Sequence, residues 1–282
     1  MHKAIVSTEW LNDNLDNPKL VLLDASFDTV IGIEPISYDQ PLVIPNSRRL
    51  DIENTVCNND VPGVHNFPTV AQFTQAARSL GVNSDSTVVI YDNQGIYSAP
   101  RGWWIFKAMG FANVFVLDGG LPRWRAEARP LAGAYSAPPQ DGNFEAELQA
   151  NRVCSYSDLL NNLDNPSFKI IDARAAKRFY GETAEPRPGL RSGHIPGACN
   201  LPFLQVLSSG SYRNADKLRA IFEELGCNYD MQLVFTCGSG VTACILLLAA
   251  ELADYQHLSL YDGSWAEWGA RSELPLATAA GE

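Results

Sequence analysis

Residues 234 to 243 are Val234-Phe235-Thr236-Cys237-Gly238-Ser239-Gly240-Val241-Thr242-Ala243, and they join a short apolar run to a long apolar segment. The run has the length of a buried strand, and the segment after the loop has the composition of a helix. Two glycines let the loop fold tightly around the cysteine, with backbone N–H groups directed at its sulfur. The helix dipole adds positive potential there. We therefore predict that Cys237 is a thiolate nucleophile, rather than a cysteine packed at a strand end.

The strand that leads into this loop has a counterpart roughly 145 residues earlier, and so do two other apolar runs, which is the signature of an internal repeat. The matched runs are 20–25 with 169–173, 87–92 with 232–237, and 114–120 with 258–263. Because the three runs recur in one order at nearly constant spacing, we predict a duplicated domain.

The runs and the segments between them predict the fold class. Each run is apolar and ends in a polar residue, which is typical of strands buried on both faces. Glycines follow three of the helix-like segments as stop signals. The helix-like segments are 70–80, 100–109, 216–225 and 241–253, and the glycines are Gly81, Gly110 and Gly226. Alternating strands and helices predict an α/β fold of tandem duplicated domains, each with a mostly parallel central sheet flanked by helices.

The domains predicted from the repeat are 1–140 and 150–282. A segment rich in proline, glycine and alanine, Arg129–Arg152, is the expected linker, with the boundary near residue 145. In the first copy Asp92 takes the place of Cys237, and residues 93–95 take the place of 238–240. Because a carboxylate is not a soft nucleophile, we expect the first copy to be catalytically silent and the second to be catalytic.

Composition and charge limit the classes of partner. The 282 residues are 46% hydrophobic and 19% charged, as in ordinary globular proteins. A net charge of −11 argues against nucleic acid or an anionic membrane surface as a partner. No apolar run has signal-peptide length at the N-terminus, and the longest run, 243–250, falls far short of the ~20 residues that span a bilayer. We expect a cytoplasmic protein without a membrane partner.

The six cysteines show no C-x-x-C pair and no regular spacing, so neither a disulfide framework nor a zinc site is expected. Reduced thiols are the default in the cytosol, and five of the six are expected to pack in the core. These five are Cys57, Cys154, Cys199, Cys227 and Cys244. We predict no metal and no organic cofactor.

Several motifs outside the cysteine loop also match a known family. They are 98–104 and 117–121 in the first half, and 172–174, 178–179 and 193–198 in the second. With the Cys237 loop, they make the chain resemble the two-domain sulfurtransferases of the rhodanese superfamily over nearly all of its length. The resemblance implies a duplicated α/β domain, an inactive first copy and a cysteine that carries sulfur as a persulfide.

The loop resembles the version of this family that uses 3-mercaptopyruvate as sulfur donor. The version that uses thiosulfate has basic side chains at the positions of Gly238 to Gly240. Thiosulfate is a dianion whose charge would lie beside a loop that here has no lysine or arginine. We therefore expect 3-mercaptopyruvate as the donor, with release of pyruvate, and a thiol, thioredoxin or cyanide as the acceptor. Thiosulfate:cyanide sulfurtransferase activity is the alternative.

The resemblance also assigns roles to two arginines and to the loop. It implies that Arg178 and Arg187 bind the carboxylate and keto oxygens of the donor, for which their planar forks are well shaped. The alternative is that both arginines pair with surface glutamates such as Glu182 and Glu185. In the loop, the residues expected to contact substrate are Gly238, Gly240, Val241 and Thr242.

A second set of expectations from the resemblance concerns a relay. The family has a histidine in the silent domain that is proposed to act with the loop serine and an acidic residue. Here these are His65, Ser239 and Glu53, the last standing where the family usually has aspartate. A lone loop histidine more often faces solvent, so the relay rests on the resemblance alone.

Three further residues are predicted to be structural. Asp172 and Arg174 are expected to pair at a strand end, and His194, in a Gly-His-Ile-Pro-Gly turn, is expected to serve the fold. The segment 27–46 departs from the family pattern, so an irregular edge is expected in the first domain.

Two other functions remain to be weighed. Cysteine-loop phosphatases share this fold, but they need an arginine at the end of the loop, where this chain has Val241-Thr242-Ala243. A non-enzymatic sulfur-binding module is the third possibility, and the intact cysteine with its glycines argues against it.

Overall fold

The structure is a computed structural model that describes residues 4–165 and 167–278. It divides into two compact units. The N-terminal unit comprises the chain up to Asn58, Phe67–Gln149 and Ser209–Tyr212. The C-terminal unit comprises Asn59–Asn66, Ala150–Ser208 and the chain from Arg213 onward. Each unit therefore includes a short segment from the other half of the sequence.

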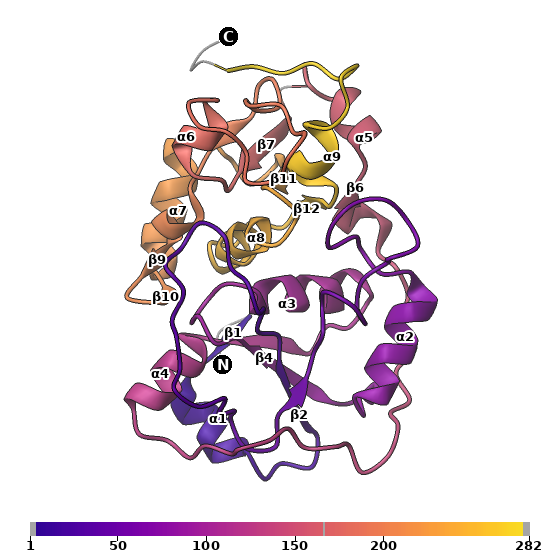
Figure 1. Cartoon of the computed structure of the whole chain (residues 1–282), viewed down its shortest axis with the longest axis vertical. Coiled ribbons are helices and arrows are strands. Elements are labelled where there is room, and N and C mark those ends of the chain that lie inside the picture. The colour runs from indigo at the N-terminus through magenta and orange to yellow at the C-terminus, as the bar shows by residue number, and fades with distance from the viewer. Residues whose placement is uncertain (1–3, 166, 279–282) are drawn as a thin grey trace. The chain divides into compact units, whose positions relative to one another are not determined.

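The N-terminal unit is built on a parallel five-stranded sheet with the order β1-β5-β4-β2-β3 (Figure 1). Its strands and helices are β1 (Ile5–Val6), α1 (Thr8–Asn14), β2 (Leu20–Asp24), β3 (Arg48–Arg49), α2 (Val70–Ser79), β4 (Thr87–Tyr91), α3 (Ala99–Ala108), β5 (Val114–Leu117) and α4 (Gly120–Ala126). The long segment between β2 and β3 has no helix and no strand, as expected from its departure from the family pattern.

The C-terminal unit repeats this sheet with the order β6-β12-β11-β7-β8, again parallel throughout. Its elements are η1 (Ala150–Arg152), β6 (Val153–Cys154), α5 (Tyr156–Leu160), β7 (Phe168–Asp172), α6 (Ala176–Phe179), β8 (Cys199–Asn200), η2 (Phe203–Val206), β9 (Leu207–Ser208), α7 (Ala215–Glu224), β11 (Gln232–Thr236), α8 (Ala243–Leu252), β12 (Leu258–Tyr261) and α9 (Ser264–Trp268). The short strand β10 (Ser211–Tyr212) pairs with β9. The same strand order in both units confirms the predicted tandem α/β fold.

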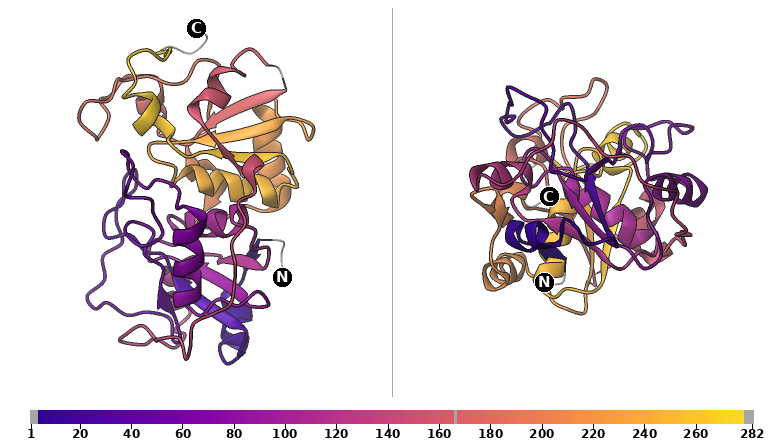
Figure 2. Two further views of the ribbon diagram at one scale, coloured as in Figure 1. Left: turned by 90° about the vertical axis from the view of Figure 1, so that its right-hand side faces the viewer. Right: turned by 90° about the horizontal axis from the view of Figure 1, so that it is seen from below.

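In doubly wound parallel sheets, right-handed crossovers in opposite directions place helices on both faces. In the N-terminal unit α1 packs against α4, and α3 packs on β4 and β5. In the C-terminal unit α8 lies against β11, β12 and α7, and Figures 1 and 2 show it in dark yellow. Nearly every side chain of α8 is buried, as its apolar sequence requires. The central strands are buried along almost their whole length.

The helices end where the sequence predicts, within one or two residues. Gly81, Gly110 and Gly226 have φ values of 72°, 85° and 73°, the left-handed conformation of helix-terminating glycines. The main difference is that α8 begins at Ala243 rather than Val241, so the preceding loop is longer than expected. The predicted linker packs on the N-terminal unit as far as Gln149, with Phe144 buried.

Among residues 4–165 and 167–278, no helix is both long and apolar enough to cross a membrane.

Candidate functional site

Cys237 follows the carboxyl end of β11 and begins the loop that leads into α8. Because β11 lies between β12 and β7, this is the edge of the sheet where ligands bind in open parallel folds. Cys237 is 2% exposed. Its amide donates a hydrogen bond to Ser264 Oγ at 3.2 Å. The carbonyl groups of Cys237 and Gly238 accept from the N–H groups of Trp265 and Ala266, each at 2.9 Å. The first two residues of the loop are therefore fixed to the start of α9.

The rest of the loop keeps its N–H groups available. Within the described ranges, the backbone N–H groups of five loop residues donate to no protein acceptor. These residues are Gly238, Ser239, Val241, Thr242 and Ala243. Gly240 has a φ of 75°, which turns the chain back on itself. Consecutive N–H groups in such a turn form a concave site for an anion.

The equivalent loop of the N-terminal unit shows such a site with its anion in place. The Asp92 carboxylate, which is fully buried, accepts from the N–H of Gln94 at 2.9 Å through Oδ1. Its Oδ2 accepts from the N–H groups of Tyr97, Ser98 and Ala99 at 2.8, 3.0 and 2.9 Å. Burial raises the pKa of the Asp92 carboxyl, and the N–H groups oppose that rise.

One backbone bond shows that the two loops are equivalent. Leu121 N–H donates to the carbonyl of Asp92 at 3.0 Å, as Trp265 N–H does to that of Cys237. The Asp92 loop is one residue longer, because α3 begins at Ala99 and α8 at Ala243. The expected match of 93–95 with 238–240 holds at Gly95 and Gly240, which stand at the same distance along the chain from Asp92 and Cys237 and have φ values of 100° and 75°, so the extra residue follows Gly95.

Two arginines converge on Gly238. A methyl group built on Gly238 would lie 3.2 Å from Nη2 of Arg178 and 3.7 Å from Nη1 of Arg187. A side chain at this position would therefore compete with both guanidinium groups for space. The loop has no basic residue of its own, and the segment after β7 brings positive charge to it.

Arg178 is held by a buried ion network. Glu185 accepts from its Nε at 3.2 Å and its Nη2 at 2.6 Å, and from Nη1 of Arg174 at 2.9 Å. The predicted pair of Asp172 and Arg174 is confirmed, with 2.7 Å between Oδ2 and Nη2. The alternative expectation was that both arginines pair with surface glutamates, and it is confirmed only for the pairing of Arg178 with Glu185. Arg178 does pair with Glu185, but the Glu185 side chain is only 2% exposed and belongs to the interior.

Arg187 differs from Arg178 in its contacts. No carboxylate lies within ion-pair distance of it in the described part of the chain. Its Nη2 lies 3.4 Å from Ser239 Oγ. The side chain of Arg187 thus has hydrogen-bonding capacity left for another anion.

Ser239 is also close to a histidine. His65 Nδ1 lies 3.1 Å from Ser239 Oγ, and both residues belong to the C-terminal unit, His65 through the segment Asn59–Asn66. His65 has a φ of 56°, a left-handed conformation that costs energy outside glycine. The histidine and serine of the expected relay are therefore within hydrogen-bonding distance.

The third relay residue, Glu53, belongs to the N-terminal unit. Burial, followed by the charges of Asp28 and Asp51, raises the pKa of its carboxyl. Its part in the relay stays a prediction.

Sequence reasoning missed Ser264. Its side chain is fully buried, its φ is 50°, and its Oγ accepts the Cys237 amide while donating to the carbonyl of Tyr261. The other copy has Gly120 at the same position, with a φ of 51°. The sequence contained a signal for this role, because Ser264 stands where the first copy has Gly120. A non-glycine residue in a left-handed conformation costs energy, so such a residue is expected only where its side chain has a function.

His194 occupies the structural position expected for it. Its ring stacks on Phe179 with 3.8 Å between centroids, and its Nδ1 lies 2.9 Å from the Phe179 carbonyl oxygen. Burial lowers its pKa below the ordinary value. These contacts tie the turn that contains His194 to the end of α6.

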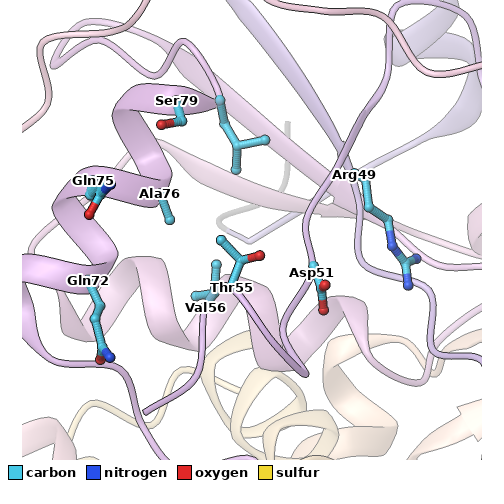
Figure 3. A pocket seen from close by; sticks show the side chains of 9 residues that line it. Arg49, Asp51, Thr55, Val56, Gln72, Gln75, Ala76 and Ser79 are labelled. Atoms are coloured by element: carbon cyan, nitrogen blue, oxygen red, sulfur yellow. The ribbon is translucent and has the colours of Figure 1, made fainter. Parts of the chain in front are cut away.

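Two cavities are lined by residues of the N-terminal unit alone. The larger, about 430 Å³, opens at the carboxyl ends of β2 and β4, between Asp24 and Asn93. The smaller, about 280 Å³, lies between α2 and the segment that follows β3, and Figure 3 shows Gln72, Gln75 and Ser79 along the helix side of it.

Comparisons with known proteins agree with this geometry. A family model described as Rhodanese-like domain matches residues 7–127 and again residues 155–271. The 3-mercaptopyruvate sulfurtransferase of Escherichia coli (strain K12) is 39% identical over 275 residues, which cover 96% of each chain. The thiosulfate sulfurtransferase of Cricetulus griseus is 36% identical over 277 residues, 95% of this chain and 92% of its own. The crystal structure of SseA from Escherichia coli, titled as a 3-mercaptopyruvate sulfotransferase with the rhodanese fold, has 36% identity and a TM-score of 0.81, covering 93% of this chain and 98% of its own.

Proposed function

The chain belongs to the rhodanese-like domain family, with one copy in each half, and on that premise we propose that it is a 3-mercaptopyruvate sulfurtransferase. The proposed reaction passes the donor sulfur through a persulfide on Cys237 to an acceptor and releases pyruvate. The observation that carries the proposal is the convergence of Arg178 and Arg187 on Gly238, the residue next to the cysteine.

The first half-reaction needs a thiolate and a held donor. The Cys237 thiolate attacks the thiol sulfur of 3-mercaptopyruvate, a sulfur–sulfur bond forms, and the carbon–sulfur bond breaks. The electron pair of that bond passes to the carbon and into the carbonyl, so pyruvate leaves as its enolate and then takes up a proton. The loop N–H groups stabilise the sulfur anion, as those of the Asp92 loop stabilise a carboxylate.

In the proposed complex the two arginines bind the donor's oxygens. Arg178 uses Nε and Nη2 on Glu185, which fixes the direction of its remaining N–H groups. Arg187 carries no carboxylate partner in the described residues and is available for the donor's carboxylate. Two oriented guanidinium groups beside the cysteine would hold the donor for in-line attack.

Ser239 and His65 have a proposed role in handling the proton. The 3.1 Å separation of Ser239 Oγ and His65 Nδ1 allows a hydrogen bond that orients the hydroxyl. Glu53 is proposed as the acidic member of the relay, on the family resemblance.

In the second half-reaction an acceptor thiolate, or cyanide, attacks the outer sulfur of the persulfide and releases the Cys237 thiolate. Small thiols, thioredoxin and cyanide are the proposed acceptors. All six cysteines lie in the described part of the chain, and no disulfide joins any two of them, which fits work in a reducing compartment such as the cytoplasm.

Mass spectrometry after incubation with the donor tests the proposal. The native chain should gain one sulfur atom and release pyruvate, and Cys237→Ser should do neither. Cys227→Ser is the matched control, since Cys227 is buried in the same unit after α7 and should leave both signals intact. Pyruvate release by Cys237→Ser would end the proposal.

Thiosulfate remains the alternative donor, on the similarity to the thiosulfate sulfurtransferase of Cricetulus griseus. We expect kcat/KM for 3-mercaptopyruvate to exceed that for thiosulfate, measured with the same cyanide acceptor. An equal or higher value for thiosulfate would reverse the assignment of donor.

A further inference from the structure

The larger cavity of the N-terminal unit occupies the place where the C-terminal unit has an arginine. Asp24 ends β2 as Asp172 ends β7. Each carboxylate accepts, through Oδ1 at 2.9 Å, the backbone N–H of the second residue after it. Those residues are Ser26 and Arg174, so the repeat places a serine where its other copy has an arginine.

Arg174 fills a buried site with three kinds of contact. Its guanidinium pairs with the Asp172 carboxylate at 2.7 Å. Its Nη2 donates to the carbonyl of Gly193 at 2.9 Å. Its Cζ lies 4.4 Å from the ring centroid of Trp265. A carboxylate, a carbonyl and an aromatic face are together a guanidinium site.

Trp265, whose ring covers one side of the Arg174 guanidinium, has Leu121 as its counterpart in the N-terminal unit. Trp265 N–H donates to the carbonyl of Cys237, and Leu121 N–H donates in the same way to that of Asp92. Leucine in place of tryptophan enlarges the space beside the carboxylate.

Gly193, whose carbonyl accepts from Arg174, has Leu42 as its counterpart in the N-terminal unit. Val43 and His194 each form an isolated antiparallel bridge with an alanine, with reciprocal backbone hydrogen bonds. The residues before them, Leu42 and Gly193, are therefore equivalent.

All of these counterparts line one cavity of about 430 Å³: Asp24, Ser26, Leu42 and Leu121. Its volume lies in the range of small-molecule sites. It also lies at the carboxyl ends of β2 and β4, where the strand order changes direction and ligands bind in such folds. The cavity is thus the space that the missing arginine side chain would occupy.

The carboxylate at the base of this cavity lacks the cation that its counterpart has. Asp24 is 3% exposed and accepts hydrogen bonds from neutral donors, the N–H and Oγ of Ser26 and, at 3.1 Å, the hydroxyl of Tyr135. Arg49 lines the same cavity and hydrogen-bonds to the Tyr135 hydroxyl, but within the described residues it forms no ion pair with Asp24. A buried carboxylate without a direct ion pair favours a cationic ligand.

We propose that the N-terminal unit binds a small guanidinium compound in this cavity, with the guanidinium group on Asp24 in the position of the absent arginine. Arg49, whose Cα is the register partner of Asp24, offers a second contact to a carboxylate. Free arginine carries both groups and is the compound expected to use both. The proposal is independent of the sulfur-transfer chemistry at Cys237.

Titration calorimetry of the full chain with methylguanidinium chloride and with L-arginine tests this proposal. Both should bind with one site per chain, and L-arginine should bind more tightly than methylguanidinium. Urea, the neutral planar analogue, should not bind. Absence of binding by both cations at tens of millimolar would refute the proposal.

Two variants assign the site. Ser26→Arg supplies the guanidinium covalently, so it should abolish binding and raise the midpoint of thermal unfolding. Ser79→Arg is the matched control, because it places the same side chain at the smaller cavity (Figure 3) and should bind as the native chain does. If Ser26→Arg does not fold, Asp24→Asn is the variant that tests the site, and it should bind L-arginine and methylguanidinium at least tenfold more weakly than the native chain. Undiminished binding in whichever of these variants folds would overturn the assignment.

Discussion

The Glu185 carboxylate holds Arg178 through two hydrogen bonds, one from Nε at 3.2 Å and one from Nη2 at 2.6 Å. The same carboxylate accepts from Arg174, which binds Asp172. Glu185 therefore connects the strand end that anchors the fold to the arginine that lies against Gly238. It makes no contact with Cys237 among the described interactions, so it acts as a positioning residue for Arg178.

Replacing Glu185 by glutamine should loosen Arg178 without removing it. The amide keeps one acceptor oxygen but loses the charge, so KM for 3-mercaptopyruvate should rise about tenfold, equivalent to about 1.4 kcal/mol. Steady-state kinetics of Glu185→Gln, with the exposed Glu182→Gln as control, would measure this. An unchanged KM alongside a lower unfolding midpoint would show that Glu185 serves only stability.

The two arginines that we propose to bind the donor should respond differently to truncation. Arg187→Ala removes a side chain that has no ion-pair partner among the described residues, so the free energy of unfolding should change by less than about 0.5 kcal/mol. Arg178→Ala leaves the buried Glu185 with one cation instead of two and should destabilise the fold by several times more. Both variants should raise KM for 3-mercaptopyruvate. Urea unfolding and donor titration on the same preparations would reveal the contrast, and an unchanged KM in either would contradict the role of that arginine.

Ser264→Gly copies the silent repeat into the catalytic one. Glycine relieves the left-handed strain but leaves the buried Cys237 amide without its acceptor, so Ser264→Gly should be more stable than Ser264→Ala. The Cys237 amide loses its acceptor, and the rate of persulfide formation should fall by about tenfold because the loop is less well positioned. Rapid-quench mass spectrometry would measure that rate. Ser264→Ala keeps the strain while removing the hydroxyl, so it should be both slower and less stable; a native rate in both variants would exclude the positioning role.

Asp92→Asn tests whether the silent loop is an anion site. Three backbone N–H groups converge on Oδ2, and an amide at that position can no longer accept them all as a carboxylate does. The free energy of unfolding should fall by about 3 kcal/mol at neutral pH. Chemical denaturation, with the exposed Asp16→Asn as reference, would measure the loss. A difference within about 0.5 kcal/mol of that reference would mean that the buried charge is not needed.

His194 should make stability depend on pH. Burial lowers its pKa in the folded chain, so between that pKa and the ordinary value of about 6.5 the unfolded chain binds more protons. The contribution is complete above about pH 6.5 and is lost as the pH falls below it. His194→Phe keeps an aromatic ring against Phe179 and removes the titration. Unfolding curves between pH 5 and 8 should show a smaller acid loss in the variant, and parallel curves would contradict the assignment.

The order of apolar runs, glycines and polar strand ends was sufficient to predict the duplicated α/β fold and the position of Cys237 at a strand end, whereas the catalytic silence of the Asp92 copy stays a prediction. These features depend on local spacing and on side-chain chemistry, and both can be read along one chain. The pair of Asp172 and Arg174 is likewise local, since a single residue separates its members.

Tertiary structure alone brought Arg178 and Arg187 to Gly238, buried Glu185 between two arginines, and placed Ser264 under the Cys237 amide. It also replaced one expectation, since α8 starts two residues later than its apolar sequence predicts and the loop keeps more N–H groups for an anion. Contacts between segments far apart in sequence leave no periodic signal. Their energies depend on burial and orientation, which only the folded chain defines.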